Sequence, residues 1–163
     1  MAKSRTQLPA DLATANLAEG DTWIDDFVPY QLYRVTSKLN AKLMGKLKAA
    51  KVNPSQWRVL SILRAYGTLN VGKLVELTLM EQPTVSRVVA QLEQEGRVER
   101  RWSSVDSRVA ELTLTAAGAE ALEAIIPTAL RHQQLALKGF GPDEVAAFTG
   151  MLSRIEANIE FYD

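Results

Sequence analysis

The sequence predicts a mostly α-helical protein with a small β-hairpin wing, in which a winged helix-turn-helix core is flanked by long helices at both ends of the chain. Three observations predict this fold. Apolar residues recur at helical spacing along most of the chain. Two short helical segments, Val71 to about Thr78 and Pro83 to about Glu95, follow one another across a tight connection. After Gly96 the apolar period shortens to about 2, which is typical of a hairpin.

Length and composition indicate one globular domain behind a short arm. The chain has 163 residues, of which 47% are hydrophobic and 23% charged, close to the globular average. Residues 1–21 contain Pro9 and Gly20 and show no period, so we expect a flexible arm before a single domain at 22–163. Neither a secretory signal nor a run of ~18 apolar residues is present, so we expect a cytoplasmic protein.

Long amphipathic helices are predicted on both sides of the core. The N-terminal pair, residues 22–52, begins at a Thr22–Asp25 capping box and is interrupted at Pro29. The C-terminal part, residues 116–163, is capped by Thr115, bends at Pro127 and ends in a helix with a long apolar stripe. That stripe consists of Val145, Phe148, Leu152, Ile155, Ile159 and Tyr162. Both ends are more apolar than a small winged-helix core requires, so we predict dimerisation helices; packing of the two ends within one chain is the alternative.

The predicted winged helix-turn-helix at residues 53–115 contains the helix from Pro83 to about Glu95, whose two faces differ sharply. Its apolar residues fall within one narrow arc and are expected to face the core: Val85, Val88, Val89 and Leu92. Other faces carry small and hydrogen-bonding residues that suit a helix in the major groove: Thr84, Ser86, Arg87 and Gln91. An ordinary solvated helix face is the alternative interpretation.

The hairpin that follows carries a concentration of arginines. Arg97, Arg100, Arg101 and Arg108 crowd one short element with a small, polar tip at residues 103–107. A basic wing of this kind can follow the phosphate backbone and place an arginine in the minor groove. Trp102, at the start of the tip, is expected to pack against the preceding helix.

Charge distribution supports a polyanionic partner although the net charge is zero. Residues 42–110 hold 12 Lys and Arg against 6 Asp and Glu, whereas residues 111–163 hold 3 against 8. The local field of the middle segment is the one that DNA would meet. A chance difference between solvated helix faces is the alternative.

Several classes of site are excluded or disfavoured. The chain contains no Cys and one His, which excludes thiol chemistry and a zinc site built from several histidines. No paired carboxylates, glycine-rich phosphate loop or nucleophile–base constellation stands out, so we expect neither an enzyme nor a cofactor.

Two segments resemble the MarR family of bacterial transcriptional regulators. The stretch from Asp106 through Arg108 and Leu114-Thr115 to Gly118 matches that family's D-x-R-x₅-L-T-x-x-G signature. The stretch from Gln82 to Arg100 is similar to its recognition helix and the entry to its wing.

The resemblance implies a homodimer that binds pseudo-palindromic operators, usually as a repressor, and releases DNA when a small ligand binds. It assigns Arg108 to the DNA backbone or minor groove, with Asp106 orienting it. Ser107 stands where the family often has a second arginine, so one potential DNA-contacting charge is missing. Redox-sensing relatives use Cys, and this chain has none.

A small organic effector is the signal that remains once oxidation and multi-histidine metal binding are disfavoured. Aromatic residues on the first helices and one cation are the candidate ligand contacts: Trp23, Tyr30, Tyr33, Trp57 and Arg58. Apolar walls with one cation suit an aromatic acid or a similar acyl compound. Core or dimer-interface packing of the same aromatics is the alternative.

The sequence therefore predicts a dimeric, ligand-responsive DNA-binding regulator. A winged-helix module that binds protein instead of an operator is the alternative, and an enzyme has the least support.

Overall fold

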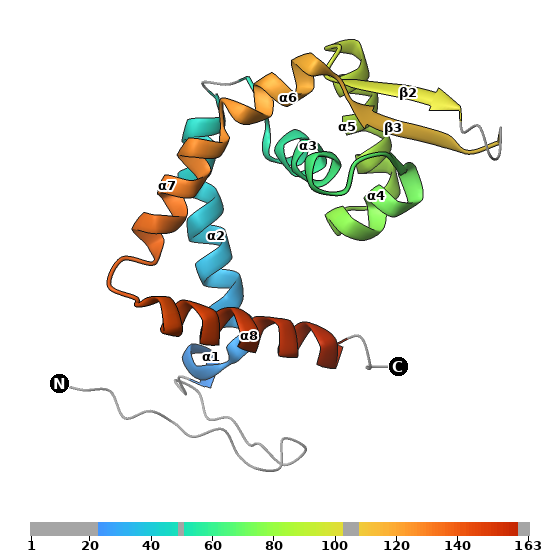
Figure 1. The fold of residues 1–163 in the computed structure, drawn as a ribbon. Helices are drawn as coiled ribbons and strands as arrows, with labels where there is room; N and C mark the ends of the chain where they lie inside the picture. Colours follow the sequence, from blue (N-terminus) through green and yellow to red (C-terminus); the bar gives the residue numbers. More distant parts are fainter. Residues whose placement is uncertain (1–22, 49–50, 103–107, 160–163) are drawn as a thin grey trace. The chain divides into compact units, whose positions relative to one another are not determined.

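The computed structural model describes residues 23–48, 51–102 and 108–159. Its elements in chain order are α1 (Trp23–Asp26), α2 (Val28–Leu47), α3 (Pro54–Tyr66), β1 (Leu69–Asn70), α4 (Val71–Thr78), α5 (Gln82–Gln94), β2 (Val98–Trp102), β3 (Ala110–Leu114), α6 (Ala116–Glu123), α7 (Ile126–Ala136) and α8 (Pro142–Ile159). The chain divides into two compact units, Met1–Lys46 and Leu47–Asp163. The predicted fold class is confirmed: the chain is mostly helical and contains a winged helix-turn-helix lobe, formed by α3 to α6 with the three strands (Figure 1).

Local sequence explains where the helices of the lobe begin. Asn53 caps α3 in a capping box, in which the Gln56 backbone N–H donates to Asn53 Oδ1 over 2.9 Å and the Asn53 N–H donates to Gln56 Oε1 over 3.0 Å. Asn70 caps α4 by accepting from the Lys73 N–H over 2.8 Å. A break between α6 and α7 precedes Pro127, where the bend is predicted.

A three-stranded antiparallel sheet, in the order β1-β3-β2, replaces the predicted two-stranded hairpin. The hairpin itself has Val98 opposite Leu114, Arg100 opposite Leu112 and Trp102 opposite Ala110. The additional strand is only Leu69–Asn70, which pairs with β3. Two residues are too few to show a period, so the sequence gives no signal for this strand.

The hydrophobic core lies inside the lobe, between α3, α4, α5, α6 and the sheet. Its members are almost completely buried: Val59, Leu60, Leu63, Leu74, Val85, Val88, Val89, Leu92, Val98, Leu112, Leu122 and Ile125. Within the described residues, α7 and α8 contribute no buried side chain. None of the described helices combines the length and the apolar character needed to cross a membrane.

Candidate nucleic-acid interface

A left-handed residue and a pair of hydrogen bonds set the turn between α4 and α5. Leu79 ends α4 with φ of 52°, an uncommon conformation for a residue with a side chain. Arg58, on α3, donates to the carbonyl oxygen of Thr78 over 3.1 Å, which satisfies one acceptor at the end of α4. Thr78 Oγ1 donates to the Leu74 carbonyl over 2.5 Å. The helix-turn-helix is therefore held from α3, the helix that carries Arg58.

Helix α5 buries its apolar arc and exposes its polar face, as predicted. The side chains of Val85, Val88, Val89 and Leu92 are at most 2% exposed. Among the predicted contact residues, Ser86, Arg87 and Gln91 are exposed and Thr84 is half-buried. Small and hydrogen-bonding side chains thus face solvent along one side of a helix that the core holds rigidly.

Two of the hairpin arginines are engaged inside the lobe. Arg100 Nε and Nη2 donate to the two carboxylate oxygens of Glu93 on α5, each over 3.0 Å. The hydrogen bond to Glu93 is the main cause that raises the pKa of the Arg100 guanidinium, against the opposing effect of partial burial. This bidentate pair joins strand β2 to the predicted recognition helix.

Arg97 makes a second link, from the end of α5 to the start of α3. Its guanidinium lies 3.1 Å from the Glu95 carboxylate and donates to the carbonyl oxygen of Lys51 over 3.3 Å. Glu95 also accepts from Gln56 Nε2 over 2.9 Å. Arg97 and Arg100 therefore position the wing, which the count of hairpin arginines alone does not reveal.

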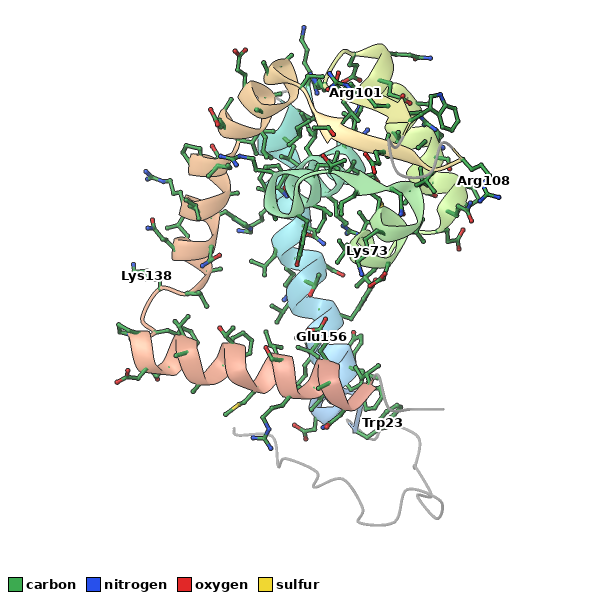
Figure 2. All side chains as sticks on the ribbon, turned by 45° about the vertical axis from the view of Figure 1, so that its right-hand side comes forward. Trp23, Lys73, Arg101, Arg108, Lys138 and Glu156 are labelled. Atoms are coloured by element: carbon green, nitrogen blue, oxygen red, sulfur yellow. The ribbon has the colours of Figure 1, made fainter. Side chains whose placement is uncertain are left out.

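The other two arginines face outward at the edge of the lobe, where Figure 2 shows Arg101 and Arg108 on the hairpin. The Arg101 side chain is 74% exposed and, among the described residues, pairs with Glu99 of its own strand at 2.9 Å. An exposed pair of this kind is weak and opens at little cost when a phosphate competes for the arginine. Asp106, the predicted partner of Arg108, lies outside the described residues.

Trp102 departs from its predicted packing against α5. Its side chain is 68% exposed. The residue opposite it on β3 is Ala110, whose small side chain leaves the indole uncovered. The prediction is wrong because the hairpin extends past the core, so its inward-facing positions lose their cover toward the tip.

A mostly apolar pocket of about 280 Å³ opens between α3, α6 and α7. On α3 it is lined by Trp57, Ser61 and Arg64, which share one helix face because they stand four and three residues apart. Leu122, Ile126, Ala129 and Leu130 supply apolar walls from the other helices. Among the described residues, Ser61 Oγ is the buried side-chain oxygen without a hydrogen-bond partner.

The predicted effector residues belong to both compact units of the chain. Trp57 lines this pocket, whereas Arg58 is engaged with the α4 terminus, as described above. Trp23, Tyr30 and Tyr33 belong to the other compact unit, where Tyr30 and Tyr33 stack with centroids 6.4 Å apart. Arg64 is a lining cation that sequence reasoning missed; the i, i+7 spacing from Trp57 is the signal that points to it.

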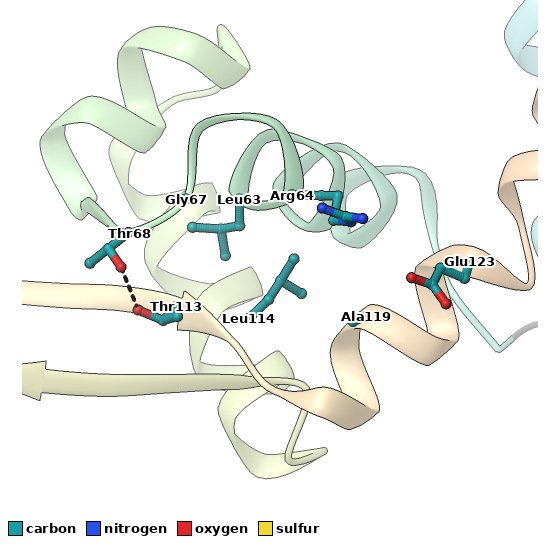
Figure 3. Close-up of a pocket in the computed structure, with 8 residues that line it drawn as sticks. All are labelled: Leu63, Arg64, Gly67, Thr68, Thr113, Leu114, Ala119 and Glu123. Carbon is teal, nitrogen blue, oxygen red and sulfur yellow. Dashed lines mark hydrogen bonds between the residues drawn. The ribbon is translucent and has the colours of Figure 1, made fainter.

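A second hollow of about 350 Å³ lies on the other side of Arg64. Figure 3 shows it between α3, β3 and α6, with Arg64 and Glu123 at one end. At the opposite end the hydroxyls of Thr68 and Thr113 bond to each other over 3.0 Å. The hollow therefore has one charged end and one end of paired hydroxyls, whereas the pocket beside Trp57 has mostly apolar walls.

Comparisons with known proteins identify the family to which this chain belongs. The model of the MarR family matches residues 52–110. The crystal structure of a MarR family transcriptional regulator from Silicibacter pomeroyi DSS is 33% identical, with a TM-score of 0.75, and the alignment covers 83% of this chain and 90% of that one. The chain belongs to the MarR family. It is a transcriptional regulator of that family, and its relatives are regulators and not enzymes.

Two other comparisons carry functional descriptions of the relatives. The HTH-type transcriptional repressor IacR of Pseudomonas putida is 25% identical over 136 residues, which are 83% of this chain and 81% of the relative. A structure described as the mechanism for regulation of DNA binding of Bordetella bronchiseptica BpsR by 6-hydroxynicotinic acid is 26% identical, with a TM-score of 0.71. Its alignment covers 79% of this chain and 98% of that chain.

The L-T-x-x-G end of the MarR signature has a structural explanation here. Thr115 Oγ1 donates to the Gly96 carbonyl over 2.7 Å and accepts from the Gly118 N–H over 3.1 Å. A Cβ on Gly118 would lie 2.0 Å from the Arg97 carbonyl oxygen, so no other residue fits there without a backbone shift. These two residues clamp the start of α6 against the turn that leads into the wing.

Proposed function

We propose that this chain binds duplex DNA as a homodimer at pseudo-palindromic operators and represses transcription there. The polar face of α5 carries the proposal, because a rigid helix that exposes Ser86, Arg87 and Gln91 suits the major groove. Thr84 lies at the edge of the same face. Arg101 and Arg108 on the wing are proposed to contact the neighbouring backbone or minor groove.

Uncovered apolar side chains on the C-terminal helices support the homodimer. On α7 and α8 these include Leu130, Leu135, Phe148, Met151 and Ile159, each exposed by between 45% and 59%. Apolar residues that no described part of one chain covers are suited to a second copy. A dimer presents two recognition helices, and two half-sites then multiply both affinity and specificity.

The pocket beside Trp57 supports regulation by a small aromatic acid. Its walls are apolar, its one arginine, Arg64, can pair with a carboxylate, and the Ser61 hydroxyl is left to bond a ligand oxygen. BpsR, whose DNA binding is described as regulated by 6-hydroxynicotinic acid, gives a precedent in a relative. A ligand here acts on DNA binding only through different affinities for the DNA-competent and incompetent arrangements.

The DNA-binding proposal is tested by fluorescence anisotropy with labelled genomic fragments over a series of salt concentrations. We expect binding that weakens steeply as salt increases, because phosphate contacts release counterions. Arg87→Ala should reduce affinity for the preferred fragment, whereas Arg131→Ala, which removes the same charge from the exposed surface of α7, should not. Absence of salt-dependent binding by the unmodified protein would favour a protein-interaction module instead.

The ligand proposal is tested by screening phenolic and aromatic acids for release of bound DNA. We expect release at millimolar concentration or below, and we expect Arg64→Gln and Ser61→Val to weaken it while leaving DNA affinity unchanged without ligand. If no aromatic acid releases DNA, the pocket proposal is wrong, although DNA binding can stand.

A further inference from the structure

Trp102 is an exposed aromatic residue at the end of strand β2, in the wing. Indole is among the largest apolar groups a protein carries, and a solvated hairpin gains no stability from displaying it. In this chain it is 68% exposed, and the side chain next to it on the strand, Arg101, is 74% exposed. An uncovered aromatic ring and an exposed cation, on consecutive residues of the same strand, point to a contact with something outside the chain.

Strand geometry places Trp102 on the face of the hairpin that is directed at α5. Side chains two residues apart share a face, so Val98, Arg100 and Trp102 point the same way. Val98 is buried in the core, and Arg100 reaches Glu93 of α5. Trp102 stands roughly 7 Å further along the strand than Arg100. Its ring therefore extends beyond the anchored pair, on the side of the predicted recognition helix.

The chemistry of that position matches the sugar–phosphate backbone of duplex DNA. If α5 lies in the major groove, the wing beside it meets the backbone that borders the groove. Deoxyribose offers an apolar face for the ring, and a phosphate oxygen can accept the indole Nε1–H. Arg101 and Arg108 supply positive charge on the same hairpin.

We propose that Trp102 is a DNA-binding residue, whose indole packs on deoxyribose and donates its N–H to a phosphate beside the recognition helix. This inference rests on the proposed function, since it needs α5 in the groove. A neutral aromatic contact adds affinity for every sequence without releasing a counterion. Loss of Trp102 should therefore lower DNA affinity without changing its salt dependence, whereas loss of an arginine that contacts a phosphate should change both.

The test compares Trp102→Ala with Arg101→Ala by fluorescence anisotropy on a preferred and an unrelated duplex. Trp102→Ala should weaken binding to both by roughly tenfold, the scale of burying part of one ring, with an unchanged slope of log K against log salt. Trp102→Phe, which keeps a ring but loses the donor, should have an affinity between that of Trp102→Ala and that of the unmodified protein. Tyr66→Ala, which removes an aromatic ring that is 60% exposed on α3, is the matched control and should bind as the unmodified protein does.

A direct optical readout comes from Trp23→Phe/Trp57→Phe, which leaves Trp102 as the sole tryptophan of the three. Its emission should change when duplex DNA is added. Unchanged affinity of Trp102→Ala with no emission change overturns the inference while DNA binding stands. A shift in oligomeric state caused by Trp102→Ala overturns it in favour of a second copy. If the unmodified protein binds no duplex, the proposed function fails and the inference with it.

Discussion

The winged helix-turn-helix lobe buries its apolar residues, whereas the C-terminal helices α7 and α8 leave theirs exposed. In the lobe, Leu60, Leu74, Leu92 and Leu112 are completely buried. In α7 and α8, no described side chain is buried, and Met151 and Ile159 are each 58% exposed. The two regions have similarly apolar sequences but reach different degrees of burial within one chain.

This difference indicates which part of the fold one chain can complete. Clamps that join different segments close the lobe: Arg100 to Glu93, Arg97 to Lys51, and Thr115 to Gly96. The C-terminal helices carry an amphipathic pattern whose apolar side is suited to a partner. Rigid presentation of α5 and the proposed pairing of two lobes are therefore separate tasks, and substitutions should separate them.

A charge on the apolar side of α8 should have the largest effect. Ile159→Glu, or Ile155→Glu one turn earlier, should dissociate the proposed dimer, because an interface cannot accept an unpaired carboxylate. Loss of the dimer should reduce operator affinity by at least about a hundredfold, since the second recognition helix no longer binds alongside the first. Sedimentation velocity measures the first effect and anisotropy the second. Ala157→Glu, on the opposite side of α8, is the control and should remain dimeric; a monomeric unmodified protein would contradict the prediction.

A substitution that crowds the contact between Gly118 and the Arg97 carbonyl should have the second-largest effect. Gly118→Ala places a Cβ 2.0 Å from the Arg97 carbonyl oxygen and should destabilise the lobe by about 3 kcal/mol. The matched change on α8, Gly150→Ala, meets nothing within 4 Å and lies away from the apolar stripe. It should stabilise the helix by up to about 1 kcal/mol. Equal effects in thermal or urea unfolding would show that the two regions do not differ as described.

Removal of the wing tether should have a smaller effect. Glu93→Gln keeps the shape of the side chain but loses the charge that holds Arg100, and should cost about 1 kcal/mol of unfolding free energy, since both groups are partly exposed. DNA affinity should fall a few-fold because the wing loses its fixed position against α5. The double-mutant cycle with Arg100→Gln isolates the coupling. Additive effects of the two changes would mean that the pair does not link wing and helix.

Removal of one exposed wing cation should leave stability unchanged and alter only DNA binding and its salt dependence. Arg101→Ala should reduce affinity for all sequences alike and flatten the slope of log K against log salt by roughly 0.9 for each phosphate that a wing no longer neutralises. Arg108→Ala should behave in the same way if Arg108 touches the backbone. An unchanged slope would remove these residues from the DNA interface.

The spacing of apolar residues along the sequence predicted the hairpin and the buried side of α5. The alternation after Gly96 located the hairpin, and the narrow arc of Val85, Val88 and Leu92 identified the buried side of α5. Strand β1 was missed because two residues carry no period. The cap at Thr115 is predicted correctly because a helix end is determined by adjacent residues.

Site chemistry was harder to predict because it depends on contacts across the fold. Arg100 is predicted to contact DNA, and that stays a prediction; its pair with Glu93, seven residues away across a turn, has no signal in the sequence. Arg58 and Arg64 both follow Trp57, but only helix geometry shows that Arg64 shares its face. Trp102 was predicted to be packed because tryptophans usually are, and only the length of the hairpin past the core exposes it.

Selection of bound sequences from a library of random DNA duplexes tests the central claim most directly. A rigid lobe presented in two copies should enrich an inverted repeat, with half-sites centred about 10 base pairs apart or at a multiple of one helical turn. Ile159→Glu should lose that enrichment, while Ala157→Glu should keep it. Enrichment of a single unpaired half-site by the unmodified protein, or of no sequence at all, would contradict the assignment of the two regions to DNA reading and to pairing.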